Sequence, residues 1–209
     1  MKYDWKKQEK HLYGKKKRPE IVTVPLQKFL AIKGEGDPNN QDFSARVGTL
    51  YPVAWKIKMG FKKFYQAHEE NQSEFDYSEF AIFPLEGIWS TKNTADITDK
   101  ASFEYKIMLR QPDWITQEMF ETALAAVAEK EPNELLQELC FETIEDGKCV
   151  QMLHVGSFDD EPASFQKMNQ FVKEQGLTRR SYLHREIYLN DARKTPPEKR
   201  QTILRYQVE

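Results

Sequence analysis

The two halves of this 209-residue chain show the same order of hydrophobic patterns. In each half, an alternating apolar stretch is followed by apolar residues three and four apart, and then by two more alternating stretches. Alternation is typical of strands and the longer spacing is typical of helices, so each half predicts strand, helix, strand, strand. The first set covers residues 21–33, 42–65, 78–89 and 105–110, and the second covers 150–155, 159–176, 181–191 and 202–208.

This repeated order indicates an α+β fold built from two units, about residues 20–111 and 112–209. We expect the units to pair their antiparallel sheets about a pseudo-twofold axis. Helices would then cover one face, and the other face would form a concave groove for a ligand. Residues 28–34 and 150–156 support a duplication, because each stretch precedes a glycine turn and a helix.

Local signals predict where several elements bend or end. Pro52 lies inside the first long helix and should either kink it or divide it in two. The polar residues 68–73 follow that helix, and a further helix is expected at 116–130. A strand at 139–144 is expected to form a hairpin with the strand after it, because the Asp146-Gly147 pair between them is a common two-residue turn.

Composition excludes several classes of protein. The net charge is only −2, which argues against nucleic-acid binding through bulk charge. No apolar run approaches the roughly 20 residues of a membrane span, and no signal peptide is recognisable, so we expect a cytoplasmic protein without a membrane partner. The sequence has no glycine-rich phosphate loop, dinucleotide-binding motif or nucleophile elbow, and we therefore expect no cofactor.

Residues 1–19 form a polar N-terminal stretch that ends in the basic run Lys15–Arg18. Such a run can contact phosphate, but it is more often a solvated tail, and we expect a tail here. Cys140 and Cys149 are expected to be free thiols in a reducing compartment. They have no accompanying histidine cluster, so no metal site is predicted.

The stretch from Ser181 to Asp191 carries the strongest site signal. If it is a strand, His184, Glu186 and Tyr188 share one face. Arg185, Ile187 and Leu189 share the other face, where the two aliphatic side chains would be anchored in the core. A carboxylate between a histidine and a tyrosine, on a strand anchored in this way, predicts that Glu186 lies in a binding cleft.

Aromatic side chains, which make up 12% of the chain, are candidates for the walls of this cleft. Flat rings offer apolar and cation-π contacts that suit polyaromatic ligands. Each ring can equally be part of the core, and a lone histidine or methionine is more often structural than functional. The candidates to contact a ligand beside Glu186 and Tyr188 are Tyr51, Trp55, Trp89, Met108, Trp114 and His154.

Six segments together resemble the stand-alone GyrI-like small-molecule-binding proteins over roughly residues 20–209. They are Leu85–Trp89, Arg110–Asp113, Cys149–Gly156, Asp159–Pro162, His184–Asp191 and Pro197–Arg205. The resemblance implies the duplicated fold and a relation to the effector-binding domains of multidrug-responsive regulators. It also implies that amphipathic, cationic or aromatic compounds bind between the repeats, with Glu186 as the acidic contact. Some similar proteins hydrolyse the cyclopropane ring of DNA-alkylating natural products.

Two positions differ from the family pattern. Arg185 stands where the motif carries a second histidine, and Trp55 stands where a tyrosine is common. The side chain of Arg185 should point away from the groove, whereas Trp55 could change ligand preference.

Three functions follow from these observations. The first is a protein that binds amphipathic small molecules for sequestration or sensing. The second is a detoxifying hydrolase in which Glu186 activates water and Tyr188 or His184 supplies a proton. The third is an interaction module whose groove takes a protein segment.

Overall fold

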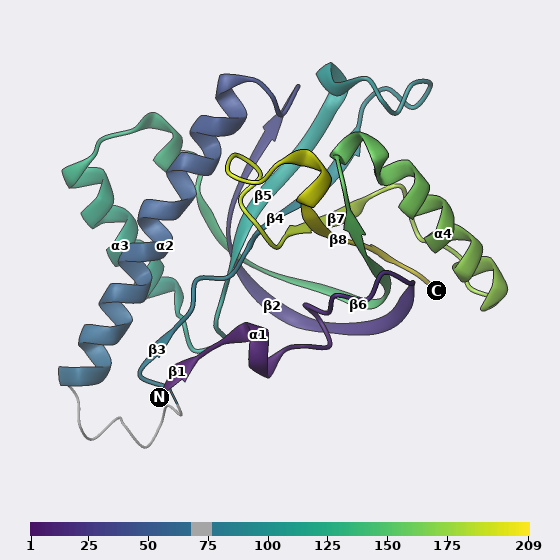
Figure 1. Ribbon diagram of the computed structural model, residues 1–209. Helices are drawn as coiled ribbons and strands as arrows, with labels where there is room; N and C mark the ends of the chain where they lie inside the picture. Colours follow the sequence, from purple (N-terminus) through teal and green to yellow (C-terminus); the bar gives the residue numbers. More distant parts are fainter. Residues whose placement is uncertain (68–76) are drawn as a thin grey trace.

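The computed structural model describes residues 1–67 and 77–209, and its centre is a closed barrel of antiparallel strands. The strands follow one another around the barrel in the order β2-β5-β4-β7-β8-β6. Three long helices lie outside it, with α2 and α3 on one side and α4 on the other (Figure 1). The strands are β2 (Glu20–Glu35), β4 (Leu85–Thr91), β5 (Phe103–Gln111), β6 (Cys140–Val155), β7 (His184–Tyr188) and β8 (Gln201–Gln207).

The mixed helix and sheet architecture confirms the predicted fold class. The helices are α2 (Gln41–Ala67), α3 (Gln117–Lys130), α4 (Glu161–Glu174) and the short α1 (Trp5–Gln8). The order strand, helix, strand, strand occurs as β2-α2-β4-β5 and again as β6-α4-β7-β8. The pseudo-twofold relation between these two sets stays a prediction.

Side chains alternate between the inside and the outside of the barrel. On β2, Phe29 and Ala31 pack inward with Met108, while Leu30 and Ile32 pack outward in the cluster that includes α2 and α3. Residues of β6 and β8 form a separate outer cluster with α4. Side chains fill the inside of the barrel, so there is no room there for a helix or a ligand. The helices and any cleft must therefore lie on the same outer face of the sheet. The expectation that the helices lie on the face opposite the groove is therefore wrong.

Helix α2 continues across Pro52 as one helix, so it is not divided in two. Its buried residues recur at helical spacing, from Leu50 through Val53 and Ile57 to Phe61, and this apolar stripe packs on the barrel. The polar residues 68–73 lie outside the described part of the chain. Among the described residues, no helix is both long and apolar enough to cross a bilayer.

Strand β6 runs without a break through Asp146 and Gly147, so the predicted hairpin is wrong. The partner strand β2 is equally long, and it pairs with β6 on both sides of this point, from Glu20 opposite Gln151 to Ala31 opposite Cys140. Gly147 has a φ of +64°, a conformation that glycine adopts without strain. Gly147 therefore allows β6 to bend without ending. The strand continues because β2 provides hydrogen-bonding partners on both sides of the bend.

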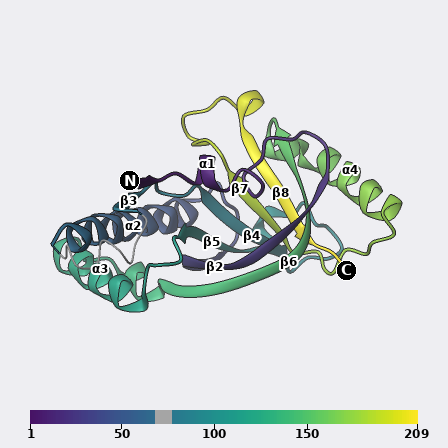
Figure 2. The same ribbon diagram turned by 90° about the horizontal axis from the view of Figure 1, so that it is seen from below.

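The N-terminal segment, residues 1–19, is part of the fold. Its strand β1 (Lys2–Tyr3) pairs in parallel with β3 (Glu79–Phe80), and Trp5, Leu12 and Tyr13 are buried. Figure 2 shows this purple segment passing close to the barrel strands. The predicted solvated tail is correct only for the exposed residues 15–18.

Charged side chains from the barrel and the N-terminal segment pair with one another inside the molecule. Glu9 accepts hydrogen bonds from Arg110 and Tyr3, and all but a tenth of its side chain is buried. Arg185 pairs with Glu86 at 3.0 Å and with Asp146 at 2.9 Å. Each buried guanidinium group in these contacts thus has a carboxylate partner, which offsets the cost of removing charge from water.

We expect Glu9→Gln to destabilise the fold strongly, because it leaves the Arg110 charge buried without its carboxylate. Loss of one partner of a buried pair costs about 3–5 kcal/mol in the free energy of unfolding. Urea denaturation followed by tryptophan fluorescence measures the change. The matched control is Glu35→Gln, whose salt bridge to Lys92 is exposed and whose loss should leave the unfolding midpoint unchanged. Equal midpoints for the two variants would show that the N-terminal segment does not stabilise the barrel.

Candidate ligand-binding and active site

A cleft of about 1800 Å³ lies on the outer surface of the barrel, where β4 and β7 are neighbours. Helix α2 contributes one wall and helix α4 contributes another. Figure 1 shows the two helices on either side of these strands. Side chains that line the cleft include Phe43, Tyr51, Trp89, Phe165, Glu186 and Tyr188.

The carboxylate of Glu186 lies in this cleft and accepts hydrogen bonds at both oxygens. The hydroxyl of Tyr188 donates to Oε2 at 2.8 Å, and Nε2 of His184 lies 3.0 Å from Oε1. Trp89 joins this hydrogen-bond network, since its Nε1 donates to the Tyr188 hydroxyl at 2.9 Å. The three side chains of β7 thus share one face, as predicted from the alternation, and Glu186 is only 8% exposed.

Gly87 makes room for this arrangement. It lies on β4 directly opposite Glu186 of β7. A Cβ atom at Gly87 would lie 2.5 Å from Nε1 of Trp89, which is far inside a normal contact distance. Only glycine therefore allows the Trp89 indole to fold over β4 and reach Tyr188.

Glu161, in the first turn of α4, is a second buried carboxyl group that lines the cleft with Glu186. Two buried carboxyl groups that are close to each other repel when both are charged. Burial, followed by the Glu186 charge, raises the pKa of Glu161 well above its usual value of 4.5. The raised pKa favours the protonated form of Glu161, beside a Glu186 side chain that accepts hydrogen bonds from Tyr188 and His184.

Tyr188 is also held in its protonated form. Burial and the adjacent Glu186 carboxylate raise the pKa of the Tyr188 hydroxyl well above 10.0. Glu186 therefore lies beside two groups whose raised pKa values favour the protonated form, Glu161 and Tyr188. Such a set can hold a cation, or it can remove a proton at one atom and supply one at another.

Aromatic rings surround these polar groups. Phe43 of α2 stacks on Trp89 with ring centroids 5.9 Å apart, and Phe158 meets Tyr188 edge-on at 5.8 Å. Phe165 of α4 packs edge-on against His184 at 4.8 Å. Sequence reasoning did not select these three phenylalanines or Glu161 for the site. The acidic start of α4 was visible, but no local pattern shows that it meets β7.

Four of the predicted ligand contacts lie outside the cleft. Trp55 is half exposed on the outer side of α2 beside Lys58, and Met108 is fully buried inside the barrel. Trp114 packs in the core between Tyr3, Tyr77 and Phe61. The spacing of residues in the sequence does not show which side of an element will face the cleft, so it could not exclude these three residues.

His154, the fourth, is a structural residue that attaches the start of α4 to β6. Its Nε2 donates to the carbonyl of Ser157 at 2.9 Å, and its Nδ1 lies 2.9 Å from Oγ of Ser164. Both ring nitrogens are therefore satisfied within the fold, as is usual for a lone histidine. Of the predicted set, Tyr51, Trp89, His184, Glu186 and Tyr188 remain at the cleft.

Among residues 1–67 and 77–209, no three His, Cys, Asp or Glu side chains are grouped so that they could hold a metal ion. The groups nearest to Glu186 in the cleft are a second carboxyl group, a phenol, an imidazole and aromatic rings, and charged side chains such as Asp191, Arg179 and Arg200 also line the cleft.

Solved structures of similar proteins share this fold. A conserved protein from Listeria innocua, described as uncharacterized, is 37% identical, with a TM-score of 0.86 over 99% of this chain and 100% of that chain. A protein described as a hydrolase from the same organism is 36% identical, with a TM-score of 0.83 over the same shares. A further Listeria innocua structure described as a hydrolase is 35% identical, with a TM-score of 0.85 over the whole of both chains. No curated protein matches the sequence.

The family comparison covers nearly the whole chain. Residues 17–208 match the GyrI-like small molecule binding domain. The match includes all six barrel strands and the three long helices. This chain therefore belongs to the GyrI-like family of small-molecule-binding domains.

Proposed function

We propose that the cleft binds flat, amphipathic aromatic molecules that carry positive charge, with Glu186 as the acidic contact. The observation that carries this proposal is the placement of a buried carboxylate among aromatic rings. A cation over the aromatic rings that line the cleft would gain cation-π contacts of about 0.5–2 kcal/mol each, in addition to attraction to Glu186. Sequestration of toxic amphipathic compounds is the simplest role for such a cleft.

The size of the cleft supports a large ligand. Most small-molecule pockets measure roughly 300–1,000 Å³, and this cleft is larger. Its walls come from both predicted units, through α2 and β4 on one side and α4 and β7 on the other. A polyaromatic compound could therefore lie across the boundary between the units, where the pseudo-twofold arrangement predicted a groove.

A second candidate is hydrolysis of a cyclopropane ring that is conjugated to a carbonyl group, as in DNA-alkylating cyclopropanoid compounds. The observation that favours it is the presence of Glu161 and Glu186 in one cleft, where the raised pKa of Glu161 suits an acid and Glu186 can act as the base. Two relatives described as hydrolases, aligned over almost their whole length, support the same candidate.

The proposed reaction adds one water molecule. Glu186 takes a proton from water while the water oxygen bonds to a ring carbon, and the ring C–C bond breaks. The electron pair of that bond passes into the conjugated carbonyl group, and the resulting oxyanion takes a proton from Glu161 or Tyr188. When Glu161 is the donor, transfer of the proton from Glu186 back to Glu161 restores the starting state. His184 orients the Glu186 carboxylate throughout.

We expect Glu186→Gln to weaken the binding of cationic aromatic dyes such as ethidium by about tenfold or more, because a buried charge pair is lost. An uncharged dye such as Nile red should bind the variant as well as the wild type. Fluorescence titration measures both affinities, and Glu129→Gln on the exposed surface of α3 is the matched control. Unchanged affinity for the cationic dye would contradict the electrostatic part of the proposal.

We expect cation binding to strengthen as the pH rises through the raised pKa of Glu161, because the cleft then gains a further negative charge near Glu186. Since folding raises this pKa, its contribution to stability is complete below the unfolded value near 4.5 and is lost as pH rises through the folded value. Glu161→Gln should remove both effects. Dye titrations and thermal unfolding from about pH 5 to about pH 9 measure them. Persistence of the pH-dependent affinity in the variant would assign it to another group.

If the protein is a hydrolase, Glu186→Gln should lower kcat by roughly 10²–10⁴-fold, the usual contribution of a general base. Mass spectrometry of a carbonyl-conjugated cyclopropane, incubated with the protein in ¹⁸O-labelled water, should show one labelled oxygen in the product. Glu129→Gln should retain full turnover. Stoichiometric binding without water addition would leave sequestration as the function.

A further inference from the structure

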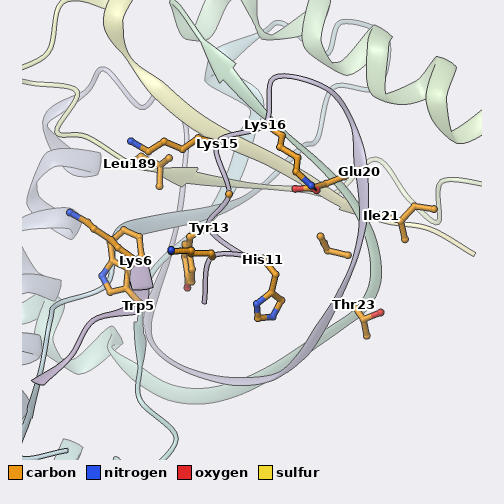
Figure 3. Close-up of a pocket in the computed structure, with 13 residues that line it drawn as sticks. Trp5, Lys6, His11, Tyr13, Lys15, Lys16, Glu20, Ile21, Thr23 and Leu189 are labelled. Carbon is orange, nitrogen blue, oxygen red and sulfur yellow. Dashed lines mark hydrogen bonds and ion pairs between the residues drawn. The ribbon is translucent and has the colours of Figure 1, made fainter. Parts of the chain in front are cut away.

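A second cavity, of about 900 Å³, lies between the N-terminal segment and the start of β2. Figure 3 shows its lining side chains, which come from residues 5–16, from the first residues of β2 and from Leu189 beyond β7. The cavity has no part in the binding or hydrolysis proposed for the Glu186 cleft. We refer to it as the N-terminal cavity.

The charge around the N-terminal cavity differs from that of the rest of the chain. Residues 1–18 contain eight Lys and Arg but only two acidic residues, so they carry a net charge of +6. Because the whole chain carries −2, the remaining residues carry −8. The basic segment therefore lies folded against an otherwise acidic molecule, and four of its lysines line the cavity: Lys6, Lys10, Lys15 and Lys16.

Most of this positive charge has no carboxylate partner. Lys16 pairs with Glu20 at 2.5 Å, and Glu20 also accepts a hydrogen bond from Gln151. Within the described part of the chain, Lys6, Lys10 and Lys15 form no ion pair. Figure 3 shows Lys6 and Lys15 extending on the side of Leu189, while Lys16 turns toward Glu20. Ammonium groups gathered at one cavity repel one another, and an anion between them would relieve that repulsion.

The base of the N-terminal cavity is aromatic and fixed in place. Trp5 and Tyr13 pack on each other with ring centroids 4.8 Å apart, and Trp5 Nε1 donates to the carbonyl of Ile82 at 3.0 Å. The backbone turns back between Glu9 and Tyr13, where the amides of Leu12 and Tyr13 donate to the carbonyl of Glu9. Gly14 follows this turn, and a Cβ atom there would lie 3.1 Å from the carbonyl of Lys10. Lys10 and Lys15, on either side of the turn, both line the cavity.

We propose that the N-terminal cavity binds an organic anion, namely a phosphate or carboxylate group attached to a flat apolar body. Lys10 and Lys15 would hold the anionic group, while the edges of Trp5 and Tyr13 and the side chain of Leu189 would contact the apolar part. Lysine is a common phosphate ligand because its ammonium group acts as a point charge. The ligand class is opposite in charge to that of the Glu186 cleft.

The two sites adjoin each other. Trp5, Lys6 and Leu189 line both the N-terminal cavity and the cleft, and Leu189 directly follows Tyr188 in the chain. The positive cavity and the cleft that contains Glu186 thus lie side by side on the molecule. Separate ligands of opposite charge could therefore occupy them at the same time.

The test uses 1-naphthyl phosphate as the probe and isothermal titration calorimetry as the measurement. Lys10→Gln/Lys15→Gln should weaken binding by about tenfold or more, since two charged contacts are lost. The matched control is Lys7→Gln/Lys17→Gln, which removes the same charge from the same segment at exposed positions that do not line the cavity. This control should change the affinity by less than about threefold, because screened distant charges contribute little.

Further measurements distinguish binding inside the N-terminal cavity from general attraction of anions to the basic segment. Inorganic phosphate and 1-naphthol should each bind more weakly than 1-naphthyl phosphate. Inorganic phosphate lacks the apolar body, and 1-naphthol lacks the anionic group. Glu186→Gln should leave the affinity for the probe unchanged. Equal losses in the two lysine variants would show diffuse charge attraction and overturn the proposal, as would no measurable binding. Binding of single-stranded DNA or anionic vesicles that the probe cannot displace would also overturn it.

Discussion

Glu86 and Arg185 form a buried ion pair inside the barrel, and the strands that carry them also carry the cleft. Glu86 immediately precedes Gly87, and Arg185 lies between His184 and Glu186. The pair therefore joins β4 to β7 from the inside at the same level at which Trp89, Tyr188 and Glu186 are hydrogen-bonded on the outside. Ordered polar side chains in the interior can hold a strand pair in one register, because any slip would leave buried charge unpaired.

The closed barrel explains where ligands can and cannot bind. Its interior is occupied by Phe29, Met108 and the charged pairs, so a ligand must bind on the outer surface. Helices α2, α3 and α4 cover parts of that surface, and the Glu186 cleft lies on β4 and β7 between α2 and α4. The N-terminal segment supplies Glu9 to Arg110 inside the molecule and also places its lysines around the N-terminal cavity. One segment thus serves both stability and the second proposed site.

Much of the candidate site on β7 could be predicted from the sequence. Alternation assigned His184, Glu186 and Tyr188 to one face and Arg185 to the other, because successive side chains of a regular strand point to opposite faces. The same logic failed at Asp146-Gly147, because an identical dipeptide can reverse a strand or bend it. The outcome depended on the length of β2, which lies more than a hundred residues earlier in the chain. Trp55 and Trp114 lie outside the cleft for a related reason, since ring chemistry does not tell which side of a helix or loop faces the cleft.

The sequence by itself determined the order of the main strands and helices in each half, the face of β7 that carries Glu186, and the resemblance to the GyrI-like family. These depend on periodicity and on short motifs, which act over a few residues. Only the tertiary structure decided that Glu161 lies close to Glu186 and that Phe43, Phe158 and Phe165 complete the aromatic walls. It also decided that residues 1–14 are part of the fold. Each of these contacts joins elements distant in sequence, so it exists only after the sheet has closed and the helices have packed on it.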